Sequence, residues 1–301
     1  MKIRPVREWK NKMPFGKNIK SEASKKKRRL KYIAVLPSVI TLMNGACGFI
    51  AIVLASQSPY IIWNFLHGFD INPFSLVGYV ILLAMIADML DGRVARLTRT
   101  TSSFGGQLDS LCDTISFGVA PAFLMIRITE FYLENIRFEN ALFSVVINRV
   151  IFFSAVIYVM CTVVRLARFN VENEEDEAAH MNFTGLPSPA AAGVVVSLVI
   201  FYQQFISGIA VSQLFFVTGL PLITFFTGLL MISRVRYPHL PNHLLRVKKT
   251  LPSLLLIFGS GIFIIWNIQL ALLIGFCGFM VFGVCRELIL TVSKKTSQPQ
   301  A

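Results

Sequence analysis

Charged side chains are scarce in this 301-residue chain, where Asp, Glu, Lys and Arg together make up 15% of the residues. Cysteine and histidine are also few: the five cysteines contain no Cys-x-x-Cys pair, and the four histidines show no spacing that demands a chemical role. These shortages argue against a disulfide framework and against a metal centre built from cysteine. We find no internal repeat and no segment that reads as a second, soluble domain.

Apolar residues are abundant instead, at 54% of the chain with a mean hydropathy of +0.64. Apolar stretches recur along nearly the whole sequence, which predicts an all-α integral membrane protein with many transmembrane helices. Eight stretches are long enough, or nearly so, to span a bilayer: 35–56, 75–95, 106–127, 148–168, 186–206, 212–232, 251–268 and 270–290. Only a polar break at 266–269 separates the last two.

The net charge of +13 is unevenly distributed. Residues 1–31 carry thirteen Lys and Arg and only two Glu, whereas residues 51–87 carry no Lys or Arg. The positive-inside rule therefore predicts that both termini are cytoplasmic. We interpret residues 1–34 as a basic cytoplasmic or interfacial segment attracted to anionic membrane lipids, in preference to an arm for nucleic acid. The segment is too long and too charged for a cleaved secretory signal.

Four aspartates lie at the cytoplasmic ends of the second and third apolar stretches. Asp88 and Asp91 lie at the end of the second, and Asp109 and Asp113 lie in the first turns of the third, where the positive end of the helix dipole favours anions. Residues three or four apart share a helix face, and the short polar connection 97–104 makes the two helices antiparallel neighbours, so the carboxylates should converge. Each Asp in a bilayer costs roughly 2.5–3.5 kcal/mol. Divalent cations would offset that cost, and all-oxygen ligands favour Mg²⁺ or Mn²⁺.

Residues with affinity for phosphate surround these carboxylates. Gly92 and Gly105 leave backbone open to a ligand, and Arg96 and Ser102 offer charge-assisted and hydroxyl hydrogen bonds. Two divalent ions beside an arginine at a lipid-facing site are typical of phosphoryl transfer. The pattern predicts an anionic phospholipid precursor as substrate.

The run Asp88-x2-Asp91-Gly92-x2-Ala95-Arg96-x8-Gly105-x3-Asp109-x3-Asp113 resembles, position for position, the signature of the CDP-alcohol phosphotransferases. The resemblance implies a helical membrane enzyme, commonly a homodimer, that attacks the β-phosphorus of a CDP-linked alcohol and releases CMP. It implies that all four aspartates contact metal and that Asp113 is also the general base. It further implies a CDP-diacylglycerol site made by Gly92, Ala95, Arg96, Ser102, Gly105, Thr41 and Asn44.

A second set of motifs resembles the bacterial and archaeal phosphatidylserine synthases. These motifs are Arg165-Leu-Ala-Arg168-Phe-Asn170, Gly185-Leu-Pro187-Ser-Pro189 and the run 231–238. The resemblance implies L-serine as acceptor, bound through Arg165, Arg168 and Asn170. The positive-inside rule places the aspartates on the cytoplasmic side, and we expect the membrane to be a bacterial inner (plasma) membrane.

The two resemblances cover residues 35–240, a six-helix core, and leave 241–301 as two additional helices and a short tail. From the residues alone, Arg165 and Arg168 share one helix face and either bind substrate or anchor the helix end at the interface. Pro187 and Pro189 should start the fifth span, as a cap or as part of a pocket.

Two other functions remain open. A sister enzyme would use glycerol 3-phosphate, inositol phosphate or choline; the first two need additional cations and choline needs an aromatic cage, and neither is plain in the sequence. A cation transporter would also carry acids within its spans. Its acids should lie near the midplane on several helices, often with a repeat, whereas here they gather at one end of two consecutive helices.

Overall fold

The computed structural model describes residues 38–57, 59, 72–98, 103–136, 141–175, 185–208, 210–235, 237 and 267–296. Within these ranges the chain forms helices joined by turns, without a strand. The helices are Ser38–Ser56, α3 (Pro73–Thr98), α4 (Ser103–Asp113), the π-helix η1 (Thr114–Val119), α5 (Ala120–Asn135), α6 (Ala141–Glu175), α7 (Ser188–Phe205), α8 (Ala210–Ile232) and α11 (Ile268–Thr296). The predicted all-α class is confirmed.

Seven of the described helical segments are long and apolar enough to cross a membrane. The α4, η1 and α5 segments form one of them, from Phe104 to Glu134. These seven correspond to seven of the eight predicted spans. The remaining one, 251–268, lies outside the described residues except for its last two positions, so the count of eight stays a prediction.

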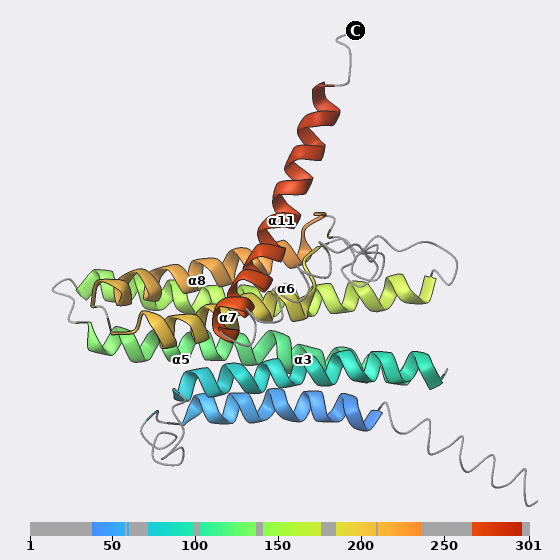
Figure 1. Cartoon of the computed structure of the whole chain (residues 1–301), viewed down its shortest axis with the longest axis horizontal. Coiled ribbons are helices and arrows are strands. Elements are labelled where there is room, and N and C mark those ends of the chain that lie inside the picture. Colours follow the sequence, from blue (N-terminus) through green and yellow to red (C-terminus); the bar gives the residue numbers. More distant parts are fainter. Residues whose placement is uncertain are drawn as a thin grey trace, which may run out of the picture.

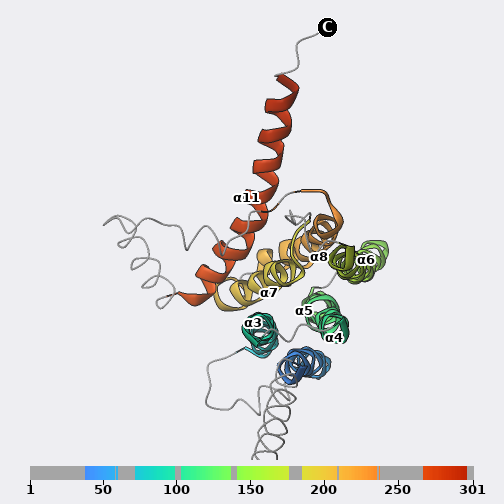
Figure 2. The ribbon, with the colours of Figure 1, turned by 90° about the vertical axis from the view of Figure 1, so that its right-hand side faces the viewer.

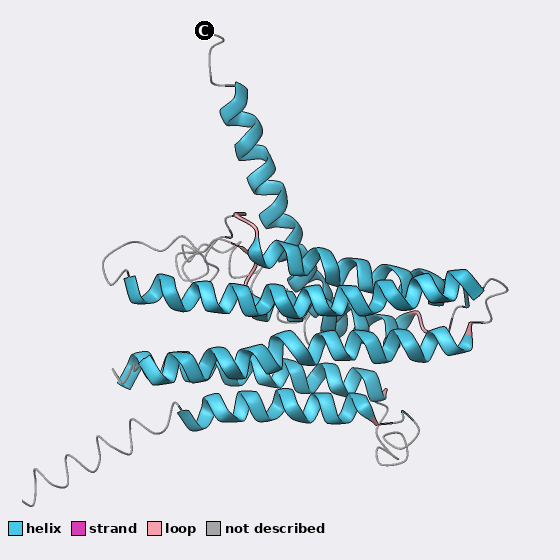
Figure 3. Ribbon diagram, turned by 180° about the vertical axis from the view of Figure 1, so that it is seen from behind, coloured by secondary structure: helices cyan, strands magenta, loops and turns pink. Residues whose placement is uncertain are grey.

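Figure 1 shows the Ser38–Ser56 helix, α3, α5, α6 and α8 side by side along a common direction. Figure 2 looks along this bundle and places α7 between α3 and α8. The close pairs include α6 with α8, α3 with α7, and α5 with α6. The α11 helix packs on α7 and then leaves the bundle, also when viewed from behind (Figure 3), and only 6% of its apolar window is buried.

Hydrogen bonds between buried polar groups connect neighbouring helices in the centre of the bundle. The Tyr158 hydroxyl on α6 donates to the Phe117 carbonyl of η1 at 2.9 Å. This carbonyl lies in a π-helical turn, where the regular ladder of backbone hydrogen bonds is interrupted. Gly228 brings α8 so close to α6 that an added Cβ would lie 3.0 Å from the Tyr158 Cα. Helix α6 is therefore held against both η1 and α8 at Tyr158.

The turn before α7 is attached to the end of α8. Gly185 N–H donates to the Val235 carbonyl at 2.9 Å, and Leu186 N–H donates to the Leu230 carbonyl at 3.0 Å. Gly185 has φ +92° and its missing Cβ would collide with the Met231 carbonyl, so only glycine suits this turn. Pro187 then caps α7, which confirms that the fifth span begins here.

Candidate active site

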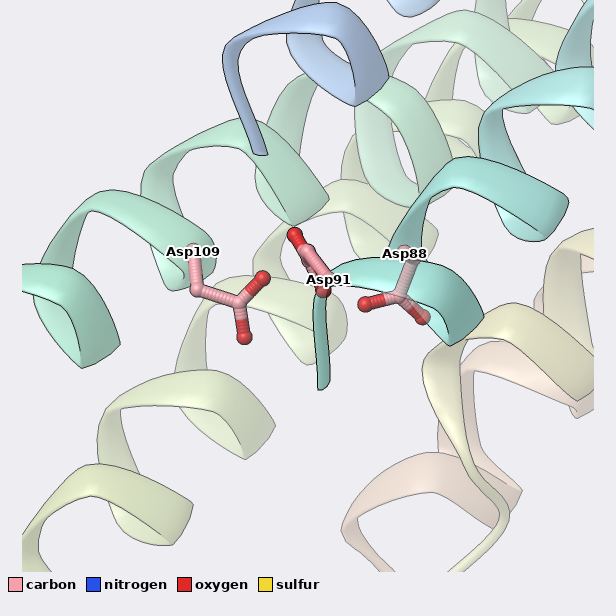
Figure 4. A group of neighbouring side chains, drawn as sticks. All are labelled: Asp88, Asp91 and Asp109. Atoms are coloured by element: carbon pink, nitrogen blue, oxygen red, sulfur yellow. The ribbon is translucent and has the colours of Figure 1, made fainter. Parts of the chain in front are cut away.

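Three of the four predicted carboxylates meet at one end of the bundle. Asp88 and Asp91 lie in the last turns of α3, and Asp109 lies in α4. Ligand oxygens of these three side chains all lie within 4.8 Å of one another. Figure 4 shows the Asp91 carboxylate between those of Asp88 and Asp109. Side chains from α3 and α4 therefore point into one space.

The oxygens of this cluster are suited to a divalent metal. Asp91 Oδ2 and Asp109 Oδ1 are buried, and neither finds a hydrogen-bond partner among the described residues. Buried polar atoms in folded proteins are almost always paired, and a cation held by the three aspartates would pair these oxygens and balance their like charges. The donor set consists of carboxylate oxygens only, which fits Mg²⁺ or Mn²⁺.

Asp113 is not one of these three residues; it is the last residue of α4, directly before η1. Its side chain is only 7% exposed. The Asn44 amide donates to Asp113 Oδ1 at 2.9 Å, across 69 residues of sequence. Asp113 also interacts by charge with Asp88 and Asp109, so all four aspartates share one electrostatic environment.

The Ser38–Ser56 helix faces the carboxylates directly. Thr41 is a side-chain hydrogen-bond partner of Asp91, as Asn44 is of Asp113. Both side chains are buried. The sequence predicted these two residues as part of the CDP-diacylglycerol site, whereas the structure gives each of them a protein carboxylate as partner.

Helix α6 brings the predicted acceptor residues to the same end of the bundle. Arg165 donates to the Ser188 hydroxyl of α7 at 2.6 Å and interacts by charge with Asp88 and Asp113. The Ser110 hydroxyl, one residue after Asp109, donates to Asn170 Oδ1 at 3.0 Å. Arg168 lies between these two on α6 and is exposed.

Ser110 and Ser188 were not among the predicted site residues. Ser188 belongs to the Gly185-Leu-Pro187-Ser-Pro189 motif, and Ser110 adjoins an aspartate of the signature. Their positions in motifs were visible, but serine is common at helix starts and interiors alike. Only the folded contacts with Arg165 and Asn170 distinguish them.

The predicted diphosphate residues are partly described. A Cβ at Gly92 would meet nothing within 4 Å, so the backbone there is open to a ligand. Gly105 is partly exposed in the first turn of α4. The side chains of Ala95 and Arg96, and all of Ser102, lie outside the described residues.

Comparison with known proteins gives one matching family and several related enzymes. The family described as CDP-alcohol phosphatidyltransferase matches residues 34–226. A CDP-diacylglycerol–serine O-phosphatidyltransferase of Methanocaldococcus jannaschii is 33% identical over 213 residues, 71% of this chain and 78% of the relative. The Helicobacter pylori protein of the same name is 32% identical over 258 residues, 86% of this chain and 93% of the relative. An archaetidylserine synthase of Methanothermobacter thermautotrophicus is 31% identical over 215 residues, 70% of this chain and 72% of the relative.

Proposed function

We propose, given that this chain belongs to the CDP-alcohol phosphatidyltransferase family, that it transfers the phosphatidyl group of CDP-diacylglycerol to L-serine. The products are phosphatidylserine and CMP. Relatives at about a third identity carry the name of this activity. The observation that carries the proposal is the cluster of Asp88, Asp91 and Asp109, with orphaned oxygens, beside Asp113 and Arg165.

The aspartates would hold the divalent metal, with Asp88, Asp91, Asp109 and Asp113 as ligands of two Mg²⁺ or Mn²⁺ ions. When bound, the metal neutralises the negative charge of the diphosphate. Gly92 and Gly105, with Ala95, Arg96 and Ser102 of the signature, would contact the nucleotide and diphosphate. The open space at Gly92 supports close approach of a ligand to the backbone there.

The proposed chemical step is one displacement at phosphorus. The serine hydroxyl oxygen bonds to the phosphorus that carries diacylglycerol, and the bond from that phosphorus to the oxygen of CMP breaks. Asp113 takes the serine proton as general base, and CMP leaves with the bridging oxygen. The buried position of Asp113 beside the three-aspartate cluster supports this role, because a base must lie within hydrogen-bond reach of the proton it takes.

Serine would bind on the α6 side of the carboxylates. Its carboxylate suits a planar guanidinium, which donates two parallel hydrogen bonds to the two carboxylate oxygens. Arg165 interacts with Asp88 and Asp113 by charge, and Asn170 reaches Ser110 beside Asp109, so both have partners at the proposed reaction site. Arg168 would contribute positive charge at the entrance.

Our proposals for orientation and assembly rest on the distribution of charge in the sequence and on the family. We propose that the aspartate end of the bundle and both termini face the cytoplasm of a bacterial inner membrane, since Lys and Arg concentrate on that side. We also propose a homodimer, which is common in the family. Anionic lipids would attract the basic segment 1–34.

Incubation of the purified enzyme with CDP-diacylglycerol and a panel of acceptors tests the function. We expect CMP release with L-serine and none with glycerol 3-phosphate, inositol phosphate or choline. The Asp109→Asn enzyme, which lacks one carboxylate of the site, is the matched control. It measures the CMP that forms from CDP-diacylglycerol without transfer by the enzyme. Robust CMP release with another acceptor, and none with serine, would replace serine by that acceptor and leave the phosphotransferase assignment intact.

A further inference from the structure

Asn44 is the polar side chain of the first described helix that lies deepest against the site. Its side chain has 0% exposure, so it offers no surface to a substrate. The Nδ2 atom donates to Asp113 Oδ1 at 2.9 Å. The assignment of nitrogen and oxygen is fixed by chemistry, because an amide oxygen facing a carboxylate would be repelled. The contact therefore joins two buried groups rather than a protein group and a ligand.

The helix that carries Asn44 packs closely against the residues before and after Asp113. A Cβ at Gly45 would lie 2.9 Å from the Cys112 sulfur, and one at Gly48 would collide with Ser116. The Ser116 hydroxyl donates back to the Asn44 carbonyl at 2.9 Å. Asn44 thus contacts residues on either side of the junction between α4 and η1, through its side chain and its backbone.

The contact is important because Asp113 lies at the junction between α4 and η1. Asp113 is the last residue of α4, and the helix changes from α to π geometry at Thr114. A carboxylate at such a junction, beside Asp88 and Asp109, experiences repulsion from like charges. A neutral donor can hold one of its oxygens without adding charge to the site.

We infer that Asn44 is a positioning residue that orients the Asp113 carboxylate. This inference deepens the proposed function and rests on the role of Asp113 as general base. The amide engages Oδ1 and so directs the second oxygen, Oδ2, toward the serine hydroxyl. Asn44 contacts neither substrate. This differs from the role in CDP-diacylglycerol binding that the sequence resemblance implies.

The test separates orientation of the base from binding of the lipid. Asn44→Leu fills a similar volume without a donor, and Asn44→Ala removes the side chain. We expect each to lower kcat for CMP release with serine by about 10- to 100-fold, the scale of a misplaced catalytic group. The KM values for serine and CDP-diacylglycerol should stay within about threefold of wild type, and CDP-diacylglycerol should protect both variants against thermal unfolding as it protects the wild type.

Two comparisons sharpen the result. In an Asp113→Asn background, Asn44→Leu should lower the remaining kcat by less than about threefold, because residues that act as a unit are not additive. Thr129→Val is the matched control: Thr129 is equally buried, in α5, and its hydroxyl bonds only to carbonyls of its own helix. That variant should keep the wild-type kcat.

Specific outcomes would overturn the inference. One is an Asn44→Leu enzyme with kcat within about threefold of wild type, and another is a raised KM for CDP-diacylglycerol with unchanged kcat, which would mark a direct lipid contact. Because leucine preserves packing, Asn44→Leu decides the matter if Asn44→Ala fails to fold. Absence of CMP release from the wild-type enzyme with serine would instead refute the proposed function.

Discussion

Arg165 provides a direct test of how the acceptor is held. It donates to the Ser188 hydroxyl at 2.6 Å and interacts by charge with Asp88 and Asp113. Arg165→Lys keeps the positive charge but loses the planar pair of donors that grips a carboxylate. One charge-assisted hydrogen bond contributes about 1.5–3 kcal/mol. At about 1.4 kcal/mol per factor of ten, the apparent KM for serine should rise roughly 10- to 150-fold.

The assay measures CMP release while serine is varied at saturating CDP-diacylglycerol, and then the reverse. Two further variants provide smaller expected changes in the KM for serine for comparison with Arg165→Lys. Arg168→Lys changes an exposed cation one turn along α6, so its KM for serine should rise only about 1.5- to 5-fold, the scale of an exposed ion pair. Ser188→Ala leaves the guanidinium in place and removes only its hydrogen-bond partner, and should raise that KM by an intermediate factor.

A different role for Arg165 would give a different pattern. If the guanidinium only balances the charge of the nearby aspartates, lysine would replace it and the KM for serine would stay within about threefold of wild type. A rise confined to the KM for CDP-diacylglycerol would assign Arg165 to the diphosphate. Either result would refute the proposed serine site.

Three further predictions address the base, the metal and the topology. Asp113→Asn should lower turnover by at least about 10²- to 10⁴-fold while CDP-diacylglycerol still binds, as measured by thermal protection; activity within about threefold of wild type would rule out the general base. Removal of divalent ions with a chelator should abolish CMP release, and Mg²⁺ or Mn²⁺ should restore it, because the proposed metal would balance the like charges of Asp88, Asp91 and Asp109; full activity in excess chelator would exclude the metal site. In a background without the five native cysteines, an impermeant reagent added to intact cells should label a cysteine at position 60 and not at position 100; the reverse pattern would invert the topology.

The positions of the seven described spans were predictable because apolar length in a bilayer is a strong signal, but their ends were not. The third span was predicted to stop at 127, and it continues to Glu134. Arg127 and Glu130, three residues apart, pair at 2.7 Å, and this pairing reduces the cost of carrying two charges near the end of the span. The fourth was predicted as 148–168, whereas α6 continues to Glu175, because Arg and Glu end a membrane segment without ending a helix.

The convergence of the carboxylates was predictable from helix spacing, but their surroundings were not. The sequence placed Asp109 and Asp113 in the first turns of the third span, where a helix dipole favours anions. The structure starts α4 at Ser103 and has no acidic residue in its first turn, so the dipole contributes little to either carboxylate. The contacts of Asp113 with Asn44, and of Arg165 with Ser188, join residues 69 and 23 positions apart. Such contacts depend on how closely the helices pack; for the contact of Asn44, Gly45 and Gly48 allow the close approach to Cys112 and Ser116.

The arrangement of the site suggests how one signature serves different acceptors within a family. The aspartates of α3 and α4 would hold what all such reactions share, the metal and the diphosphate. Arg165 and Asn170 come from α6, outside the signature. Asn170 accepts a hydrogen bond from Ser110 within the signature, and Arg165 interacts by charge with Asp113 and Asp88. Discrimination between acceptors needs polar groups that are left unpaired by the wrong substrate. Changes on α6 and at the start of α7 should therefore alter acceptor choice without removing phosphoryl transfer, whereas changes to the aspartates should remove transfer to every acceptor.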